Sequence, residues 1–401
     1  MAGARIVFVL RWATLGGAER QALAFARSLR HQEGAEAEIL ALTEQGGGAV
    51  DLARTLAVPW RPFPLPWKGS RLEKARQLAR LVACLRGLRP RLLLPYAGFS
   101  NVIAGLIWPW TGARACIWRQ GDDLPIDDVS SAMARRAVEA TPFFVANSRY
   151  ALRYLVTELG APEERARLVG NGVFLLPPES DRAVWRARLG ISSQVVVACM
   201  LARLHRHKDH STLLRAWRIV ERQLSGRGER AVLLLAGTPG GAEEALKALA
   251  FDLGLSSSAR FLGEVRDVAG LLSACDVGVL SSRSESCPNA ILEYMAAGLP
   301  VAGTDVPGIR EAVGEKGAAF LAPPGDVEGL AAALLGLVAS PRLRQRLAQE
   351  GKERAGRLFD LERSHEEQKA VLVEALTAAR PSLAGLPWRR PDHGERRQQE
   401  R

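Results

Sequence analysis

Short apolar segments alternate with amphipathic helical patterns twice along this chain, and this repeated alternation constrains the fold more than any other feature. The first series begins at residues 6–10, where five consecutive apolar residues are typical of a buried parallel strand. Gly16 and Gly17 then precede an amphipathic helix predicted from about residue 18 to residue 30. Further apolar runs at 38–42, 91–94, 115–118 and 143–146 alternate with helical patterns, which favours a doubly wound sheet.

Pro177 and Pro178 interrupt the chain, and the same alternation then restarts. The second series has predicted strands at 195–200, 231–236, 259–262, 277–280, 301–303 and 318–321. A chain of 401 residues is also too long for one ordinary hydrophobic core. We therefore predict an α/β protein with two Rossmann-like domains, 1–176 and 177–355, whose strands point their carboxyl ends at a central cleft.

The carboxyl-terminal part has a different pattern. A long helical pattern at 342–378 is split near Phe359 and Asp360. We expect residues 356–380 to form a helix that packs back on the first domain. The arginine-rich segment 381–401 is predicted to be a disordered basic tail.

Cysteine usage and the amino terminus favour a cytoplasmic protein. The five cysteines are scattered, so neither a disulfide framework nor a zinc site is indicated. The five apolar residues between Arg5 and Arg11 are too few for a secretory signal. The apolar stretch 92–110 approaches the length of a membrane span, but Pro95, Asn101 and Pro109 interrupt it. We expect a buried strand followed by a buried helix there, with a transmembrane helix as the alternative.

Two glutamates stand eight positions apart in Glu285-Ser-Cys-Pro-Asn-Ala-Ile-Leu-Glu293. The predicted strand 277–280 precedes them, so Glu285 is expected in the strand-to-helix loop and Glu293 about two turns on, in the helix. Both are expected to face the cleft. A pair of solvated helix carboxylates is the alternative interpretation.

Basic residues follow the first strand of the second series, in Ala-Arg203-Leu-His-Arg-His-Lys208. An Arg fork and a Lys ammonium stabilise the negative charge that grows on a diphosphate leaving group. The chain has 47 arginines but only seven lysines, so a lysine at this position is less easily explained by composition. The alternative is a basic loop that serves solubility.

In order and spacing, these segments resemble family 4 of the retaining glycosyltransferases, which have the two-domain GT-B fold. The resemblance extends from Ile6 to about residue 375. It implies that Glu285 hydrogen-bonds the donor sugar and that Glu293 holds the ribose of the nucleotide. It also implies that Arg203 and Lys208, at the family's R-x4-K positions, neutralise the diphosphate.

The resemblance implies further contacts with the nucleotide-sugar donor after other strands, at Gly16, Gly17, Gly237, Val265, Arg266, Ser286, Cys287, Pro288 and Asn289. Arg119 and Asn147 are candidate contacts of the acceptor or the donor. Glycines let backbone N–H groups approach a phosphate, although a tight turn explains Gly16-Gly17 equally well. Arg266 is expected to stack on the base.

The sequence departs from the family pattern at two places. Ser286-Cys287 stands where Gly-Phe is usual, which leaves the donor sugar open. Many relatives have a histidine after a first-domain strand, where this chain has Arg119-Gln120. In the mechanism usually proposed for this fold the leaving phosphate oxygen accepts the acceptor's proton, so a protein base is optional. An ion pair of Arg119 with Asp122 or Asp123 is the alternative role for that arginine.

We therefore predict a retaining, metal-independent glycosyltransferase without a cofactor. It transfers a sugar from a UDP- or GDP-sugar to a hydroxyl of a glycan or lipid-linked acceptor, in cell-envelope polysaccharide or lipopolysaccharide biosynthesis. Asp122-Asp123 alone is weak evidence for a metal site. The alternative is an inactive nucleotide-sugar-binding scaffold. The net charge of +11 suggests a nucleic-acid-binding protein as another hypothesis. We do not adopt this hypothesis, because the sequence contains no recognised nucleic-acid-binding module.

The positive charge is concentrated between Arg54 and Arg91, where ten basic residues accompany one acid, Glu73. Trp60, Phe63 and Trp67 lie among them in a proline-rich loop that we expect to leave rings exposed. We predict that this segment docks the first domain on an anionic membrane surface on the inner face of the plasma membrane. The alternative is that the apolar stripe of the helix at 71–86 packs on the sheet.

Overall fold

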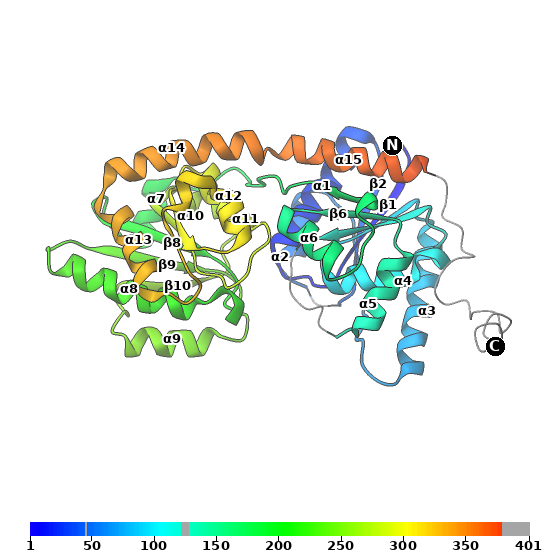
Figure 1. The fold of residues 1–401 in the computed structure, drawn as a ribbon, viewed down its shortest axis with the longest axis horizontal. Helices are drawn as coiled ribbons and strands as arrows, with labels where there is room; N and C mark the ends of the chain where they lie inside the picture. The colour runs from blue at the N-terminus through cyan, green and yellow to red at the C-terminus, as the bar shows by residue number, and fades with distance from the viewer. Residues whose placement is uncertain (45, 122–127, 379–401) are drawn as a thin grey trace, which may run out of the picture. The chain divides into compact units, whose positions relative to one another are not determined.

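A computed structural model describes residues 1–44, 46–121 and 128–378, and these form two compact units (Figure 1). Of the described residues, unit 1 contains those of Met1–Thr14 and Ala18–Val169 and residues 367–378; unit 2 contains Leu15–Gly17 and Gly170–Glu366. The predicted tail, 381–401, and the Asp122-Asp123 pair lie outside the described residues. The two units are described separately below.

Unit 1 is built on a seven-stranded parallel sheet with the order β3-β2-β1-β4-β5-β6-β7. Its strands are β1 (Arg5–Leu10), β2 (Glu36–Ala41), β3 (Trp60–Pro62), β4 (Leu92–Pro95), β5 (Ala115–Gln120), β6 (Phe143–Ala146) and β7 (Ala166–Leu168). The chain moves outward from β1 through β3 and then returns to the other side of β1 with β4. The order therefore reverses between β1 and β4, and in such sheets ligands bind at the carboxyl ends of the strands beside this reversal.

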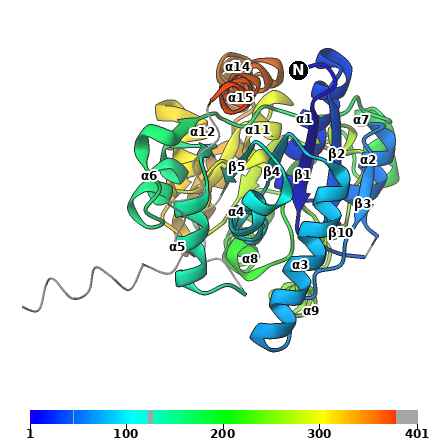
Figure 2. The same ribbon diagram turned by 90° about the vertical axis from the view of Figure 1, so that its right-hand side faces the viewer.

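The helices of unit 1 cover both faces of this sheet (Figure 2). They are α1 (Gly17–Glu33), α2 (Gly48–Thr55), α3 (Arg71–Leu88), α4 (Gly98–Thr111), α5 (Ser131–Ala140) and α6 (Arg149–Thr157), and a single 3-10 turn covers Glu163–Arg165. A capping box fixes the start of α3, because Ser70 and Glu73 hydrogen-bond each other's backbone N–H groups. The apolar stretch 92–110 is the buried strand β4 followed by the largely buried helix α4, as predicted. Within the described chain no helix is both long and apolar enough to cross a bilayer.

Unit 2 repeats the plan with a six-stranded parallel sheet, in the order β10-β9-β8-β11-β12-β13. Its strands are β8 (Val196–Leu201), β9 (Ala231–Ala236), β10 (Ala259–Gly263), β11 (Val277–Leu280), β12 (Val301–Thr304) and β13 (Leu321–Ala322). Its helices are α7 (Arg182–Arg188), α8 (His210–Ser225), α9 (Glu243–Asp252), α10 (Val268–Ser273), α11 (Asn289–Ala296), α12 (Pro307–Ala318), α13 (Val327–Ala339) and α14 (Pro341–Leu358). The strand order reverses between β8 and β11.

Helix α15 (Leu361–Thr377) follows a break at Phe359 and Asp360, as predicted. Its residues from Glu367 onward are held in unit 1 by polar contacts. Nζ of Lys369 lies 3.1 Å from Oε1 of Glu33, and Nη2 of Arg167 lies 2.7 Å from Oε1 of Glu374. Both ribbon views show α15 beside α1 (Figures 1 and 2).

The predicted α/β class with two Rossmann-like sheets is confirmed. The sequence pattern missed β3 and β7, which are edge strands of three residues each. The strand predicted at 318–321 was misplaced, because α12 continues through Ala318 and β13 begins only at Leu321.

The basic segment 54–91 is more buried than its sequence predicted. Trp67 is 7% exposed, its Nε1–H donates to the carbonyl of Asp128 at 2.7 Å, and its ring packs edge-on against Phe99. Leu81 and Leu85 of α3 lie in the same core cluster. The expectation that Trp67 is available to a membrane is therefore wrong, whereas Trp60 and Phe63 are only partly buried. Part of the apolar stripe of α3 packs on the body of unit 1, which was the alternative, but Leu72 at its start is exposed.

Candidate active site

The carboxyl ends of β8 and β11 bring together the residues that the sequence singled out in unit 2. Arg203 and Lys208 follow β8, and Glu285 lies in the loop between β11 and α11. These two strands are neighbours and flank the reversal of strand order. Because parallel strands end at one edge, side chains from both loops converge there.

Lys208 and Glu285 form an ion pair at this edge, 77 positions apart in sequence. The hydroxyl of Ser282 donates to the same carboxylate oxygen, Oε1 of Glu285, at 2.6 Å. The side chains of Lys208 and Glu285 are 31% and 11% exposed, so Lys208 is accessible from solvent and Glu285 is only slightly so. This arrangement orients both charges without enclosing them.

Ser281, Ser282 and Arg283 join the two loops, and none of them was predicted from the sequence. The Ser281 hydroxyl lies 3.0 Å from the carbonyl oxygens of both Lys208 and Asp209. The N–H of Arg283 donates to the carbonyl of His207 at 2.9 Å. Three polar residues directly after a fully buried strand were a signal that could have identified them.

Asp209 anchors the turn that presents Lys208. Its backbone is left-handed, with φ 46° and ψ 46°, a conformation that non-glycine residues seldom adopt. Its carboxylate accepts hydrogen bonds from Ser211, Thr212 and Arg283 and caps α8. Burial alone raises the pKa of Asp209, but these hydrogen bonds outweigh burial and hold the pKa below its usual value. The strained turn is therefore held by a charged cap.

The loop after β8 has a positive electrostatic field. Arg203 is exposed, and its Nε–H donates to the carbonyl of Pro239 at 3.3 Å. The pKa of His205 is lowered, first by burial and then by the positive charges of His207, Arg203, Arg206 and Lys208. A site with this field favours an anionic ligand.

Glu293 lies in the second turn of helix α11 and is only 7% exposed. Its neighbour Tyr294 is fully buried, and the Tyr294 hydroxyl accepts the N–H of Leu201 at 2.6 Å and lies 3.3 Å from the carbonyl of Val279. One phenol therefore ties α11 to the last residue of β8 and to the penultimate residue of β11.

The loop from Glu285 to Asn289 is fixed by backbone contacts. Asn171 donates its amide Nδ2 to the carbonyl of Cys287 at 3.3 Å and to Oδ1 of Asn289 at 2.9 Å. Gly308 donates its N–H to the carbonyl of Glu285, and a Cβ at Gly308 would come within 2.4 Å of that oxygen. Ser286 is buried, Cys287 is partly buried, and Pro288 is the N-cap of α11.

The predicted base-binding residues lie after β9 and β10. A Cβ at Gly237 would lie 2.0 Å from the carbonyl oxygen of Ala202, so only glycine allows this close packing of two loops. Val265 is partly buried and Arg266 is exposed. Asp267 has a structural role, because its carboxylate accepts from Trp185, Gly270 and two further backbone N–H groups.

The remaining predicted residues precede α1 or belong to unit 1. Gly16 and Gly17 lie between β1 and the body of α1. Arg119 is the penultimate residue of β5 and is 4% exposed; its guanidinium lies 5.3 Å from the ring centre of Tyr96. Asn147 follows β6 and donates Nδ2 to the carbonyl of Gly121 at 3.4 Å. In the described part of the chain no group of three or more His, Cys, Asp or Glu side chains is arranged to hold a metal ion.

Comparison with known proteins defines the class and then the family. HepE of Anabaena, solved with UDP and glucose, matches this structure with a TM-score of 0.79 over 92% of this chain and 99% of HepE, at 22% sequence identity. That likeness establishes the GT-B fold. A model described as Glycosyltransferase Family 4 matches residues 15–175, and one described as Glycosyl transferases group 1 matches residues 181–354. The chain belongs to the family 4 glycosyltransferases.

Curated relatives match over part of their length. The D-inositol 3-phosphate glycosyltransferase of Saccharomonospora viridis is 32% identical over 59% of this chain and 56% of that relative. The lipopolysaccharide core biosynthesis glycosyltransferase LpsE of Rhizobium meliloti is 31% identical over 56% of this chain and 70% of LpsE. The chain spans about half the length of the first of these relatives.

Proposed function

We propose that this protein transfers a sugar from a nucleoside diphosphate donor to a hydroxyl of a glycan or lipid-linked acceptor, with retention of configuration. The observation that carries the proposal is the Lys208–Glu285 ion pair beside the reversal of strand order in unit 2. It joins a cation suited to phosphate and a carboxylate suited to sugar hydroxyls.

The chemistry follows from the charges at this edge. When a donor diphosphate binds, its negative charge competes with Glu285 for the ammonium of Lys208, and Arg203 supplies a second cation. Glu285 is then free to accept a hydrogen bond from a hydroxyl of the donor sugar. As the glycosidic bond breaks, negative charge grows on the leaving phosphate, where fixed cations stabilise the transition state more than the ground state.

Retention needs attack from the face that the diphosphate leaves. We propose that the leaving phosphate oxygen accepts the acceptor's proton, so that no protein base is required at the position occupied by Arg119. Lys208, Arg203 and backbone N–H groups take the place of a divalent cation, which makes the reaction metal-independent. The base of the nucleotide, uracil or guanine, is left to experiment; HepE, which shares the fold, binds UDP.

The proposed acceptor class is supported by the activities for which relatives are named and by the charge of unit 1. One relative acts in lipopolysaccharide core biosynthesis and another is named for inositol 3-phosphate. We propose a cell-envelope glycan or lipid-linked acceptor, reached from the cytoplasmic side. Although Trp67 is buried, Arg71, Arg76, Arg80 and Arg86 are exposed on α3, and each basic residue near anionic lipid contributes about 1 kcal/mol.

A turnover screen tests the proposed activity. The purified protein is incubated with UDP- and GDP-sugars and lipid-linked acceptors, nucleoside diphosphate release is measured, and the anomeric configuration of the product is determined by NMR. We expect release with at least one donor, an unchanged anomeric configuration and full activity in EDTA. Tight donor binding without release would instead support an inactive scaffold, and activity restored only by manganese would contradict metal independence.

Vesicle co-sedimentation tests the membrane contact separately. Binding to phosphatidylglycerol vesicles is compared with binding to neutral phosphatidylcholine vesicles, for wild type and for the triple variant Arg71→Ser, Arg76→Ser, Arg80→Ser. We expect wild type to bind phosphatidylglycerol vesicles less strongly in high salt, because salt screens the charges. We expect the triple variant to lose this binding. The control removes the same number of exposed basic residues from α14, in Arg342→Ser, Arg346→Ser, Lys352→Ser. Equal recovery of wild type with both kinds of vesicle would favour a soluble acceptor.

A further inference from the structure

Unit 2 contains a cavity at the opposite edge of its sheet from Lys208 and Glu285. Its volume is about 470 Å³, and it lies among the end of α11, the start of β12, α12 and α14. Val301, the first residue of β12, lines it, whereas Ser281 to Glu285 follow the last residue of β11. The cavity is therefore distinct from the candidate active site. Figure 1 shows α14 running beside α11 and α12.

A break in α12 gives this cavity its shape. Gly314 interrupts the helix with φ 72° and ψ −178°, which is outside the helical region and strained for any residue with a Cβ. A Cβ at Gly314 would also lie 2.7 Å from the guanidinium carbon of Arg354. The Arg354 guanidinium occupies that space and donates to the carbonyls of Ala312 at 2.7 Å and Glu311 at 2.9 Å. Arg354 is thereby held rigid at the wall of the cavity.

The cavity wall carries three cations, Lys316, Arg354 and Arg357, and three carboxylates, Glu315, Glu350 and Glu353, so its formal charges balance. Among the described residues neither Arg354 nor Arg357 forms an ion pair with any of these carboxylates, and the charge of Arg357 acts on Arg354. Glu350 is paired with Lys316 at 3.1 Å, and Glu353 accepts from Gln349 at 2.7 Å. Within the described residues the side chain of Arg357 has no such partner, and it is exposed. The pKa of Arg354 is lowered, first by burial and then by the charge of Arg357. Glu315 also lines the cavity, but it is exposed and its charge acts on Arg310.

The floor of the cavity is apolar, formed by Met295, Leu299, Val301 and Leu347. Pockets of about 300–1,000 Å³ with an apolar lining and a few converging polar groups are typical of small-molecule sites. Guanidinium groups bind planar or tetrahedral anions through paired N–H···O bonds, and a phosphate offers enough oxygens to contact two guanidinium groups at once. Their mutual repulsion is relieved when an anion binds between them.

We propose that this cavity binds a small phosphate monoester, of the size of a phosphorylated monosaccharide, with its phosphate held by Arg354 and Arg357. Lys316 lies on the facing helix and adds a third cation when it is released from Glu350. The site is independent of sugar transfer. Because Met295 and Leu299 belong to α11 and the turn after it, an occupied cavity contacts the helix that carries Glu293.

Isothermal titration with glucose 6-phosphate as the probe tests the proposal on the full chain, with and without saturating UDP. We expect binding in both conditions, no binding of neutral glucose, and about tenfold weaker binding in Arg357→Ala, because one charge-assisted contact is lost. Arg357 is exposed and has no structural partner to lose. Arg346→Ala, which removes an exposed arginine of the same helix outside the cavity, is the matched control and should bind as wild type does.

Four outcomes would overturn the proposal. One is the absence of binding up to about 10 mM of the probe, a concentration higher than the dissociation constant of a specific site. Another is equal affinity in wild type and Arg357→Ala, because the probe would then not contact Arg357. Equal weakening in Arg346→Ala would likewise overturn the proposal, because it would show an effect of overall charge. The last is displacement of the probe by UDP, which would place the probe at the donor site. None of these outcomes bears on whether the protein releases nucleoside diphosphate.

Discussion

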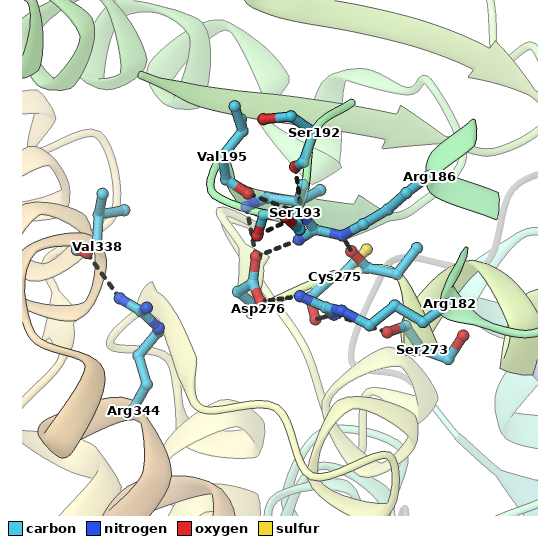
Figure 3. A network of polar contacts seen from close by, with 12 residues as sticks. Arg182, Arg186, Ser192, Ser193, Val195, Ser273, Cys275, Asp276, Val338 and Arg344 are labelled. Atoms are coloured by element: carbon cyan, nitrogen blue, oxygen red, sulfur yellow. Dashed lines mark hydrogen bonds and ion pairs between the residues drawn. The ribbon is translucent and has the colours of Figure 1, made fainter. Parts of the chain in front are cut away.

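The two edges of the second sheet each hold a cluster of charged side chains. The clusters differ in how many of their hydrogen-bonding groups have partners within the protein. At the amino ends of β8 and β11, Asp276 accepts from Arg182 and Arg186 at 2.7 Å each and from the N–H of Val197 at 2.8 Å (Figure 3). At the carboxyl ends, Glu285 has Lys208 and Ser282 as partners.

Arg186 shows the difference most clearly. Its side chain is 6% exposed and donates to the carbonyls of Ala274, Ser192, Ser193 and Val195 besides Asp276 (Figure 3). These bonds occupy the planar fork of donors that an arginine offers. Lys208, by contrast, spends its ammonium on one carboxylate and is 31% exposed. We call the Arg186–Asp276 cluster saturated, because the donors of Arg186 have protein partners, and the Lys208–Glu285 cluster unsaturated. A saturated cluster stabilises the fold, whereas an unsaturated one can exchange a protein partner for a ligand.

The largest effect should come from Arg186→Met, which breaks the saturated cluster. The substitution leaves Asp276 without its buried partner and four backbone carbonyls without a donor. Removing one member of a buried ion pair costs about 3–5 kcal/mol, so we expect a loss of this order in the free energy of unfolding of unit 2. Urea unfolding, followed by circular dichroism, measures it. A loss below about 1 kcal/mol would mean that the cluster is not structural.

Activity should separate from stability at the other edge. We expect Lys208→Met and Glu285→Gln each to lower turnover by about 2.7–4 kcal/mol of transition-state stabilisation, as when an oxyanion contact is lost. Lys208 is the more exposed partner, at 31%, so we expect the unfolding midpoint to fall less than in Arg186→Met. The control is Lys247→Met, which removes an exposed lysine paired with Glu243 on α9. Wild-type turnover in either variant would contradict the proposed site.

Much of this contrast was readable in the sequence, and part of it was not. Arg203, Lys208 and Glu285 stand out because each follows an apolar run, where a parallel sheet collects its polar residues. Arg186 and Asp276 give no such signal, since an arginine on a short helix and an aspartate before a strand are ordinary. Their pairing across 90 positions exists only in the folded chain.

The misjudged elements have a similar cause. Strands β3 and β7 are too short for a periodic pattern, and their pairing partners, β2 and β6, define them. Trp67 looked exposed because its loop contains prolines and a lysine. Tertiary packing against Phe99 and a hydrogen bond to Asp128 bury it instead. Local sequence carries no record of such distant partners.

Acid should destabilise unit 2 beside the unsaturated cluster. His210 is 1% exposed, and neither of its ring nitrogens has a hydrogen-bond partner in the described chain. Burial, and then the charge of Lys208, lower its pKa from 6.5 to about 4, while the charge of Asp209 opposes this shift. The unfolded chain therefore binds a proton that the folded chain rejects between these values. Stability is complete above pH 6.5 and is lost as pH falls towards 4.

At pH 5, His210 lowers the free energy of unfolding by about 2 kcal/mol relative to neutral pH. This loss follows from about 1.36 kcal/mol for each pH unit below 6.5, the pKa of the histidine in the unfolded chain. We expect His210→Gln to remove it, whatever its effect at neutral pH. Urea unfolding of wild type and variant at pH 7.5 and pH 5 gives the difference. Parallel losses in the two proteins would show that other groups carry the acid sensitivity.

The smallest effect is expected for Arg182→Ala, and it tests whether the two edges are independent. Arg182 is 44% exposed, and Asp276 keeps Arg186 and the Val197 N–H when it is removed. Half-exposed ion pairs are screened by solvent, so we expect a loss of about 0.5–1 kcal/mol in unfolding free energy and no change in turnover. Combining Arg182→Ala with Lys208→Met should give the sum of the single effects, because the residues lie at opposite edges of the sheet and share no partner. A coupling energy above about 0.5 kcal/mol in this double-mutant cycle would show that the saturated cluster influences the site through the strands, and the division between a structural edge and a ligand-binding edge would have to be abandoned.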